Sequence, residues 1–147
     1  MAGPFLAAGH SMGGRVALEI VRQAPDRVAG LGLLNTGVHP AAEGGAAKRQ
    51  ELVDLAYAKG NRALAGQWLP PMLSPNRVKD LRLVASLIEM VCRSTPEIFE
   101  RQVGALLRRP DAREGLDRIA CPAILASGTA DGCSPLARHE EMARHRR

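Results

Sequence analysis

The stretch Gly9-His10-Ser11-Met12-Gly13-Gly14 decides the fold of this chain. It lies between a short apolar run, Phe5-Leu6-Ala7-Ala8, and a segment whose apolar residues recur at helical spacing. A serine in a sharp turn needs neighbours without bulk, and glycine stands two residues before and two residues after Ser11. The pattern therefore predicts a buried strand, a strained turn that exposes Ser11, and an amphipathic helix.

The whole chain divides into three regions by its periodicity. Residues 1–39 add a second apolar run, Val28 to Leu34, which is typical of a parallel strand covered on both faces. Residues 40–118 show helical stripes and no convincing strand, which predicts an all-helical insertion. Residues 119–147 return to the first pattern, with a strand over 119–126, a loop, and a helix with Ser134 as its N-cap. The fold class is therefore α/β, with parallel strands and flanking helices.

Composition excludes several classes of function. The 147 residues carry a net charge of +5, but the arginines are scattered and no aromatic residues lie between them, so we expect no nucleic-acid partner. No apolar run approaches the ~20 residues of a membrane helix and the N-terminus lacks a signal-peptide layout, so we expect no membrane partner and a cytoplasmic location. Three cysteines without Cys-x-x-Cys spacing predict reduced thiols and no metal site.

Two later segments extend the pattern that begins at the serine turn. They are Cys121-Pro122-Ala123-Ile124-Leu125 and the loop Gly128-x-x-Asp131. Together with Gly-x-Ser-x-Gly, they resemble the α/β-hydrolase fold family, specifically its capped serine esterase and lactonase members, over nearly the whole chain. The resemblance implies a partial α/β-hydrolase fold, with core segments at 1–39 and 119–147 and a helical cap over 40–118.

The same resemblance assigns roles to individual residues. Ser11, between the elbow glycines Gly9 and Gly13, matches the nucleophile. The backbone N–H of Met12 matches one donor of the oxyanion hole. Asp131 matches the acid that orients a catalytic histidine, and its alternative role is an Asx turn before Gly132.

The catalytic histidine of the family has no match in this chain. In the family that histidine follows one more strand, and several strands precede the elbow, so the resemblance implies truncation at both ends. Among the histidines present, His39 and His139 are candidates to line a pocket, with surface or packing roles as the simpler alternative. Trp68 is a further candidate for the pocket, although core packing explains it more simply.

The leading functional prediction is a hydrolase of a carboxylic ester or lactone that uses Ser11 and no cofactor. The alternative is a catalytically inactive, truncated remnant that binds a partner or forms a homo-oligomer. Three neighbouring strands would leave two sheet edges unpaired. Such edges favour pairing with a second copy of the chain or with a complementing chain.

Overall fold

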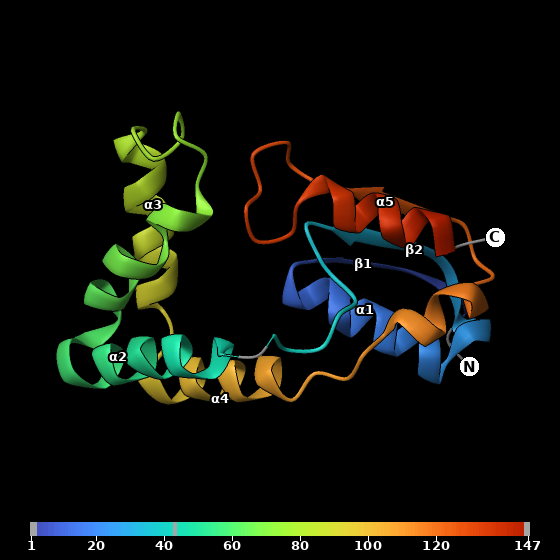
Figure 1. Ribbon diagram of the computed structural model, residues 1–147, viewed down its shortest axis with the longest axis horizontal. Helices are drawn as coiled ribbons and strands as arrows, with labels where there is room; N and C mark the ends of the chain where they lie inside the picture. Colours follow the sequence, from blue (N-terminus) through green and yellow to red (C-terminus); the bar gives the residue numbers. More distant parts are fainter. Residues whose placement is uncertain (1–2, 43, 146–147) are drawn as a thin grey trace. The chain divides into compact units, whose positions relative to one another are not determined.

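We describe the protein from a computed structural model, which defines residues 3–42 and 44–145. The chain forms two compact units, one made of Met1–Pro40 with Pro110–Arg147 and the other of Ala41–Arg109. The first, the sheet unit, contains the strands, and the second, the helical unit, contains helices α2 to α4 (Figure 1).

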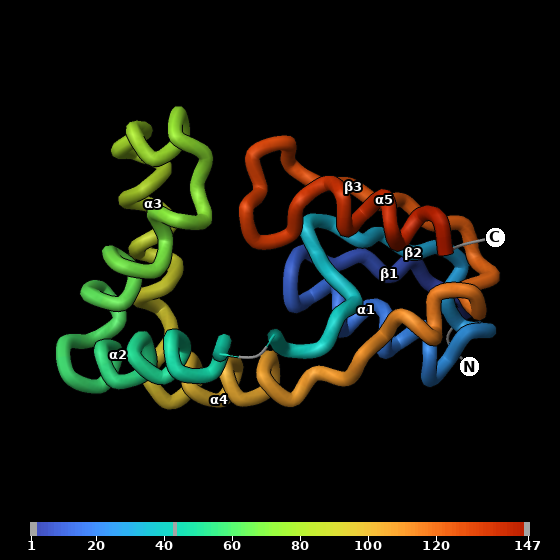
Figure 2. Tube along the Cα trace, in the orientation of Figure 1, coloured from blue at the N-terminus to red at the C-terminus, as the bar shows by residue number. Residues whose placement is uncertain are grey.

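The strands of the described residues form one parallel three-stranded sheet. Its order is β1-β2-β3, with β1 at Phe5–His10, β2 at Val28–Leu34 and β3 at Ala123–Ala126 (Figure 2). This arrangement confirms the predicted α/β class and the predicted adjacency of the three strands.

The third strand is shorter than the predicted strand over 119–126. Residues Arg113–Arg118 form the 3₁₀ helix η3, and the ladder begins where Leu31 donates its N–H to the carbonyl of Pro122 at 2.9 Å. Proline has no N–H to give to the sheet, so regular pairing starts one residue later.

Helices α1, Met12–Gln23, and α5, Leu136–His145, supply the core of the sheet unit. Buried residues of both helices pack in one cluster with strand residues. Leu33 and Met142 are the most deeply buried members, at 0 % exposure. The cluster also includes Leu116 and Ile119, so the segment around η3 packs with the sheet unit.

One face of the sheet stays open within the described residues. Alternate residues of a strand point to opposite faces, so Ala7, Leu31 and Leu33 share the covered face. On the other face, Leu6 is 79 % exposed and Ile124 is 70 % exposed. Burial of parallel strands on both faces, which the sequence suggested, is therefore met on one face only.

The helical unit consists of α2 (Gly45–Trp68), η2 (Pro70–Met72), α3 (Leu81–Cys92) and α4 (Pro96–Leu107). Helix α2 is kinked at Gly60, whose φ of 78° suits glycine. Thr95 caps α4 by accepting the N–H of Ile98, as expected for a Thr-Pro helix start. Trp68 packs edge-on against Phe99 inside this unit, with ring centres 5.5 Å apart.

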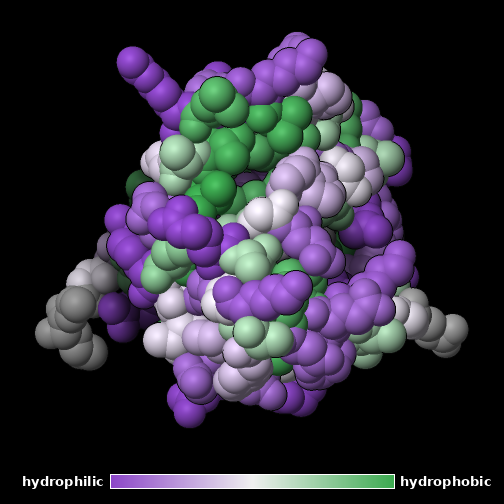
Figure 3. Space-filling model, turned by 90° about the vertical axis from the view of Figure 1, so that its left-hand side faces the viewer, coloured by the Kyte–Doolittle hydropathy of each residue, from purple (hydrophilic) through white to green (hydrophobic). Residues whose placement is uncertain are grey.

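The surface of the helical unit carries a hydrophobic patch at the level of α3 (Figure 3). Leu81 is 80 % exposed and Met90 is 48 % exposed on this helix. Among the described residues, no helix has the length and apolar character needed to span a membrane.

Truncation of a leucine to alanine should lower stability far more on the covered face of the sheet than on the open face. Leu33→Ala should lower the free energy of unfolding by about 2–5 kcal/mol, because it leaves a cavity in the core. Leu6→Ala on the open face should change it by less than about 0.5 kcal/mol. Urea denaturation of both variants measures the difference, and equal losses would contradict the one-sided sheet.

Candidate active site

Ser11 occupies the turn between β1 and α1 with a backbone that only a few residues adopt. Its φ is 52° and its ψ is −116°, which is a strained conformation for a residue with a side chain. Hydrogen bonds hold it there: Ser11 donates its N–H to the carbonyl of Leu34 at 2.9 Å, and its own carbonyl accepts the Gly14 N–H and the Thr36 hydroxyl. The side chain of Ser11 is exposed as a result.

The glycines around Ser11 do not have equal roles. A Cβ on Gly9 would lie 2.1 Å from the backbone carbon of Gly13. Such a clash is with backbone atoms, so no side-chain movement can relieve it. A Cβ on Gly13 would meet nothing within 4 Å, so the expected steric need for glycine there is wrong. A Cβ on Gly14 would lie 2.7 Å from the Thr36 side chain, a constraint that the sequence pattern did not reveal. Close packing of α1 on β1 and β2 therefore depends on Gly9 and Gly14.

Met12 is the first residue of α1. The N–H groups of a helix's first turn have no acceptor within the helix, and the helix dipole adds partial positive charge there. No acidic side chain lies in the first turn of α1 to neutralise it. The Met12 N–H is therefore suited to stabilise negative charge beside Ser11.

Asp131 lies in the loop that follows β3 and is held by several donors. Its Oδ1 accepts the backbone N–H of Cys133 at 2.7 Å and of Ser134 at 2.8 Å. Its Oδ2 accepts the side-chain amide of Asn35. Burial raises the pKa of Asp131, but these hydrogen bonds and the nearby charge of His10 outweigh it, so the pKa lies below its ordinary value. Asp131 is therefore a carboxylate at neutral pH.

The end of β2 contributes two residues that the sequence did not single out as site residues. Asn35 has a φ of 46°, donates its N–H to Ala126 at 2.8 Å and reaches Asp131 with its side chain. Thr36 is 2 % exposed and lies beside Gly14. The only signal for them in the sequence was their position at the carboxyl end of an apolar run, where α/β folds place their sites.

Ser134 differs from its predicted role as a helix N-cap. Its hydroxyl donates to the carbonyl of Thr36 at 2.5 Å, and α5 begins at Leu136. The residue therefore ties the acid loop to the end of β2.

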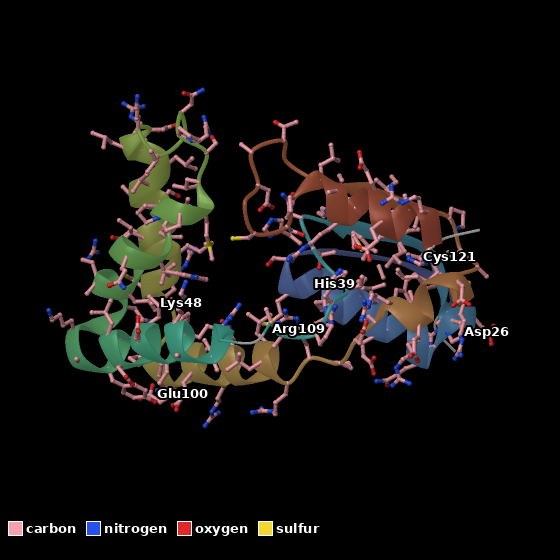
Figure 4. All side chains as sticks on the ribbon, in the orientation of Figure 1. Asp26, His39, Lys48, Glu100, Arg109 and Cys121 are labelled. Carbon is pink, nitrogen blue, oxygen red and sulfur yellow. The ribbon has the colours of Figure 1, made fainter. Side chains whose placement is uncertain are left out.

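The histidines predicted near a pocket have structural partners. His139 is 3 % exposed, and its Nε2 accepts the Thr36 N–H at 3.3 Å. His39, labelled in Figure 4, lies on the segment after β2. Its Nε2 is 3.3 Å from a carboxylate oxygen of Glu141. Across residues 3–42 and 44–145, the Ser11 hydroxyl makes no hydrogen bond to a histidine. The structure brings Ser11, Asp131, Asn35 and Thr36 to one edge of the sheet.

The described part of the chain contains no cluster of side chains that could hold a metal ion. No three His, Cys, Asp or Glu side chains there lie close enough to share an ion.

Comparison with solved structures establishes the fold. The chain matches a thermophilic esterase from Thermogutta terrifontis with a TM-score of 0.87 and 26 % identity, over 98 % of this chain and 53 % of the esterase. It matches the enol-lactonase from Burkholderia xenovorans with a TM-score of 0.84 and 23 % identity, over 97 % of this chain and 54 % of the lactonase. The chain carries part of the α/β-hydrolase fold.

Comparison of the sequence with family models does not identify a family. No family model matches the chain. An uncharacterized protein of Synechocystis sp. is 27 % identical over 131 residues, which cover 88 % of this chain and 48 % of that protein. The chain thus spans about half the length of each of these three proteins.

The glycine geometry at the elbow gives a matched pair of substitutions. Gly9→Ala should lower the free energy of unfolding by roughly 2–4 kcal/mol or abolish folding, because its Cβ would overlap the Gly13 backbone. Gly13→Ala should leave stability equal or slightly higher, since alanine favours the helix and the space is open. Thermal unfolding followed by circular dichroism compares the two, and a larger loss for Gly13→Ala would contradict the geometry.

Proposed function

We propose that this chain carries the nucleophile and the acid of a serine hydrolase for carboxylic esters or lactones. The observation that carries the proposal is the strained backbone of Ser11 at the end of β1, with an ionised Asp131 after β3 at the same edge of the sheet. An esterase and an enol-lactonase share the fold over nearly the whole chain, which supports this choice of substrate class.

In this mechanism the Ser11 Oγ attacks the carbonyl carbon while a histidine takes the hydroxyl proton. The Met12 N–H stabilises the oxyanion of the tetrahedral intermediate. The leaving alkoxide departs with the proton from the histidine, and water then hydrolyses the acyl-serine by the reverse proton path. Asp131 orients the histidine and stabilises its positive charge.

The histidine of this mechanism is proposed to come from outside the chain. His139 is buried with its Nε2 engaged by Thr36, and His39 pairs with Glu141, so neither is placed as the base of Ser11. The helical unit is proposed to act as the cap that shapes the acyl pocket, with Trp68 as a candidate lining residue. A cytoplasmic location stays a prediction from the sequence.

Ester hydrolysis measured with and without added imidazole tests the role of Ser11. The purified chain should hydrolyse 4-nitrophenyl acetate no faster than Ser11→Ala, because no histidine bonds to the Ser11 hydroxyl within the described residues. Added imidazole should produce a rate above its own background in wild type and in Ser86→Ala, an exposed serine of α3, but not in Ser11→Ala. Mass spectrometry should find the acetyl group on Ser11.

Two outcomes would overturn the proposal. One is an imidazole-dependent rate that Ser11→Ala retains, and the other is acetylation spread over several serines. A Ser11-dependent rate without imidazole would instead place the base inside the chain.

A second candidate function is self-association through the open face of the sheet. Parallel strands are nearly always covered on both faces, and this face exposes Leu6 at 79 % and Ile124 at 70 %. We propose a second copy of the chain as the occupant of this face.

Charge placed on the open face tests that candidate. The double variant Leu6→Lys, Ile124→Lys should shift the chain from oligomer to monomer, because lysine cannot be desolvated in such an interface. Leu81→Lys, at an equally exposed leucine of the helical unit, serves as the control and should not change the molar mass. Size-exclusion chromatography with light scattering measures it, and a monomeric wild type would exclude self-association.

A further inference from the structure

Two consecutive residues at the end of the middle strand connect the serine turn to the acid loop. β2 lies between β1 and β3, so the residues that follow it are next to both Ser11 and Asp131. Asn35 and Thr36 follow Leu34, the last residue of β2. Each makes polar contacts on a different side.

Asn35 acts on the acid. Its backbone N–H donates to Ala126, the last residue of β3, at 2.8 Å, which fixes the residue against the neighbouring strand. Its φ of 46° is accepted by asparagine more readily than by most residues. The side-chain amide donates to Oδ2 of Asp131, while backbone amides occupy Oδ1. Asn35 is the only described side chain that donates a hydrogen bond to this carboxylate.

Thr36 acts on the nucleophile. Its hydroxyl donates to the carbonyl of Ser11 at 2.6 Å, and its methyl and Oγ1 face the position of a Cβ on Gly14. Its carbonyl accepts the Ser134 hydroxyl at 2.5 Å, and its N–H donates to His139. All three polar groups of a residue that is 2 % exposed are therefore used.

We propose that Asn35 and Thr36 are positioning residues that hold the acid and the nucleophile at a fixed separation. The proposal rests on the proposed function, because the separation matters only if Ser11 and Asp131 serve one reaction. Both residues act through other groups and neither is assigned contact with the substrate.

The physical reason is the tolerance of a catalytic arrangement. A displacement of about 1 Å between reacting groups costs ~10²-fold in rate. Side chains on loops keep such geometry only when further hydrogen bonds fix them. Ser11 and Asp131 lie in different turns, and the segment that contacts both is the pair after β2.

The role of Asn35 is tested by removing its amide without changing its backbone. Glycine accepts a positive φ, so Asn35→Gly removes the hydrogen bond to Asp131 and keeps the turn. The pKa of Asp131 should rise, because a donor to the charged form is lost. Asn35→Asp should raise it further, since two carboxylates then share one site. NMR titration of the Cys133 and Ser134 amide protons, which bond to Asp131, reports this pKa.

The sign of the accompanying stability change follows from the lowered pKa in the folded state. The hydrogen bond from Asn35 stabilises the fold above the unfolded pKa of about 4 and its contribution is lost as the pH falls through the folded value. The stability difference between wild type and Asn35→Gly should therefore shrink on acidification.

The role of Thr36 is tested with a matched pair of variants. Thr36→Val keeps the shape but removes the hydroxyl that bonds to Ser11, whereas Thr36→Ser keeps the hydroxyl. Hydrogen exchange of the Ser11 amide should be roughly fivefold faster in Thr36→Val than in Thr36→Ser. The imidazole-assisted acetylation of Ser11 should fall about tenfold in its maximal rate in Thr36→Val, with the half-saturating ester concentration unchanged.

The outcomes separate this inference from the proposed function. An unchanged Asp131 titration in Asn35→Gly, or equal Ser11 exchange in Thr36→Val and Thr36→Ser, would overturn the positioning roles whatever the hydrolysis rates are. If both NMR effects occur but wild type shows no acetylation that depends on Ser11, the proposed function fails and the pair is reduced to a structural link. Both NMR effects together with the tenfold loss of acetylation support the inference.

Discussion

The close approach of Gly9 to Gly13 is the contact on which the rest of the sheet unit depends. A Cβ of Gly9 would lie 2.1 Å from the Gly13 backbone, and Ser11 alone separates the end of β1 from the start of α1. Because no second connecting residue shares the change in direction, the strain falls on Ser11, with its φ of 52°. The exposure of the Ser11 side chain is thus a consequence of how tightly the helix joins the strand.

That strain is maintained by the neighbouring strand. The carbonyl of Leu34 accepts the Ser11 N–H, and the hydroxyl of Thr36 donates to the Ser11 carbonyl. The same segment reaches the acid loop through Asn35 and Ser134. Hydrogen bonds from the residues after β2 therefore reach both the serine turn and the acid loop.

Within the described residues, one face of the sheet has no cover and the Ser11 hydroxyl has no bond to a histidine. The chain spans about half the length of the α/β-hydrolase proteins that it matches, and within the described residues one sheet face exposes Leu6 and Ile124. A hydrolase assembled around this stretch would bring both a cover for that face and a base for Ser11. A self-associating module would bring only the cover.

The sequence by itself determined the α/β class and the strained serine turn. These follow from local signals: apolar runs of strand length, helical periodicity, and small residues around Ser11. Predictions from the same signals were wrong about the steric need for glycine at Gly13 and about the length of β3. The space near a glycine and the start of a strand ladder depend on what packs against them.

Only the tertiary structure decided the partners of the polar groups. Ser134 fits a helix N-cap in sequence, yet its hydroxyl serves Thr36, which is 98 positions away along the chain. Asn35 and Asp131 are 96 positions apart, and no periodicity links them. Their hydrogen bond exists because parallel strands bring their carboxyl ends to one edge of the sheet, where loops distant in sequence become neighbours.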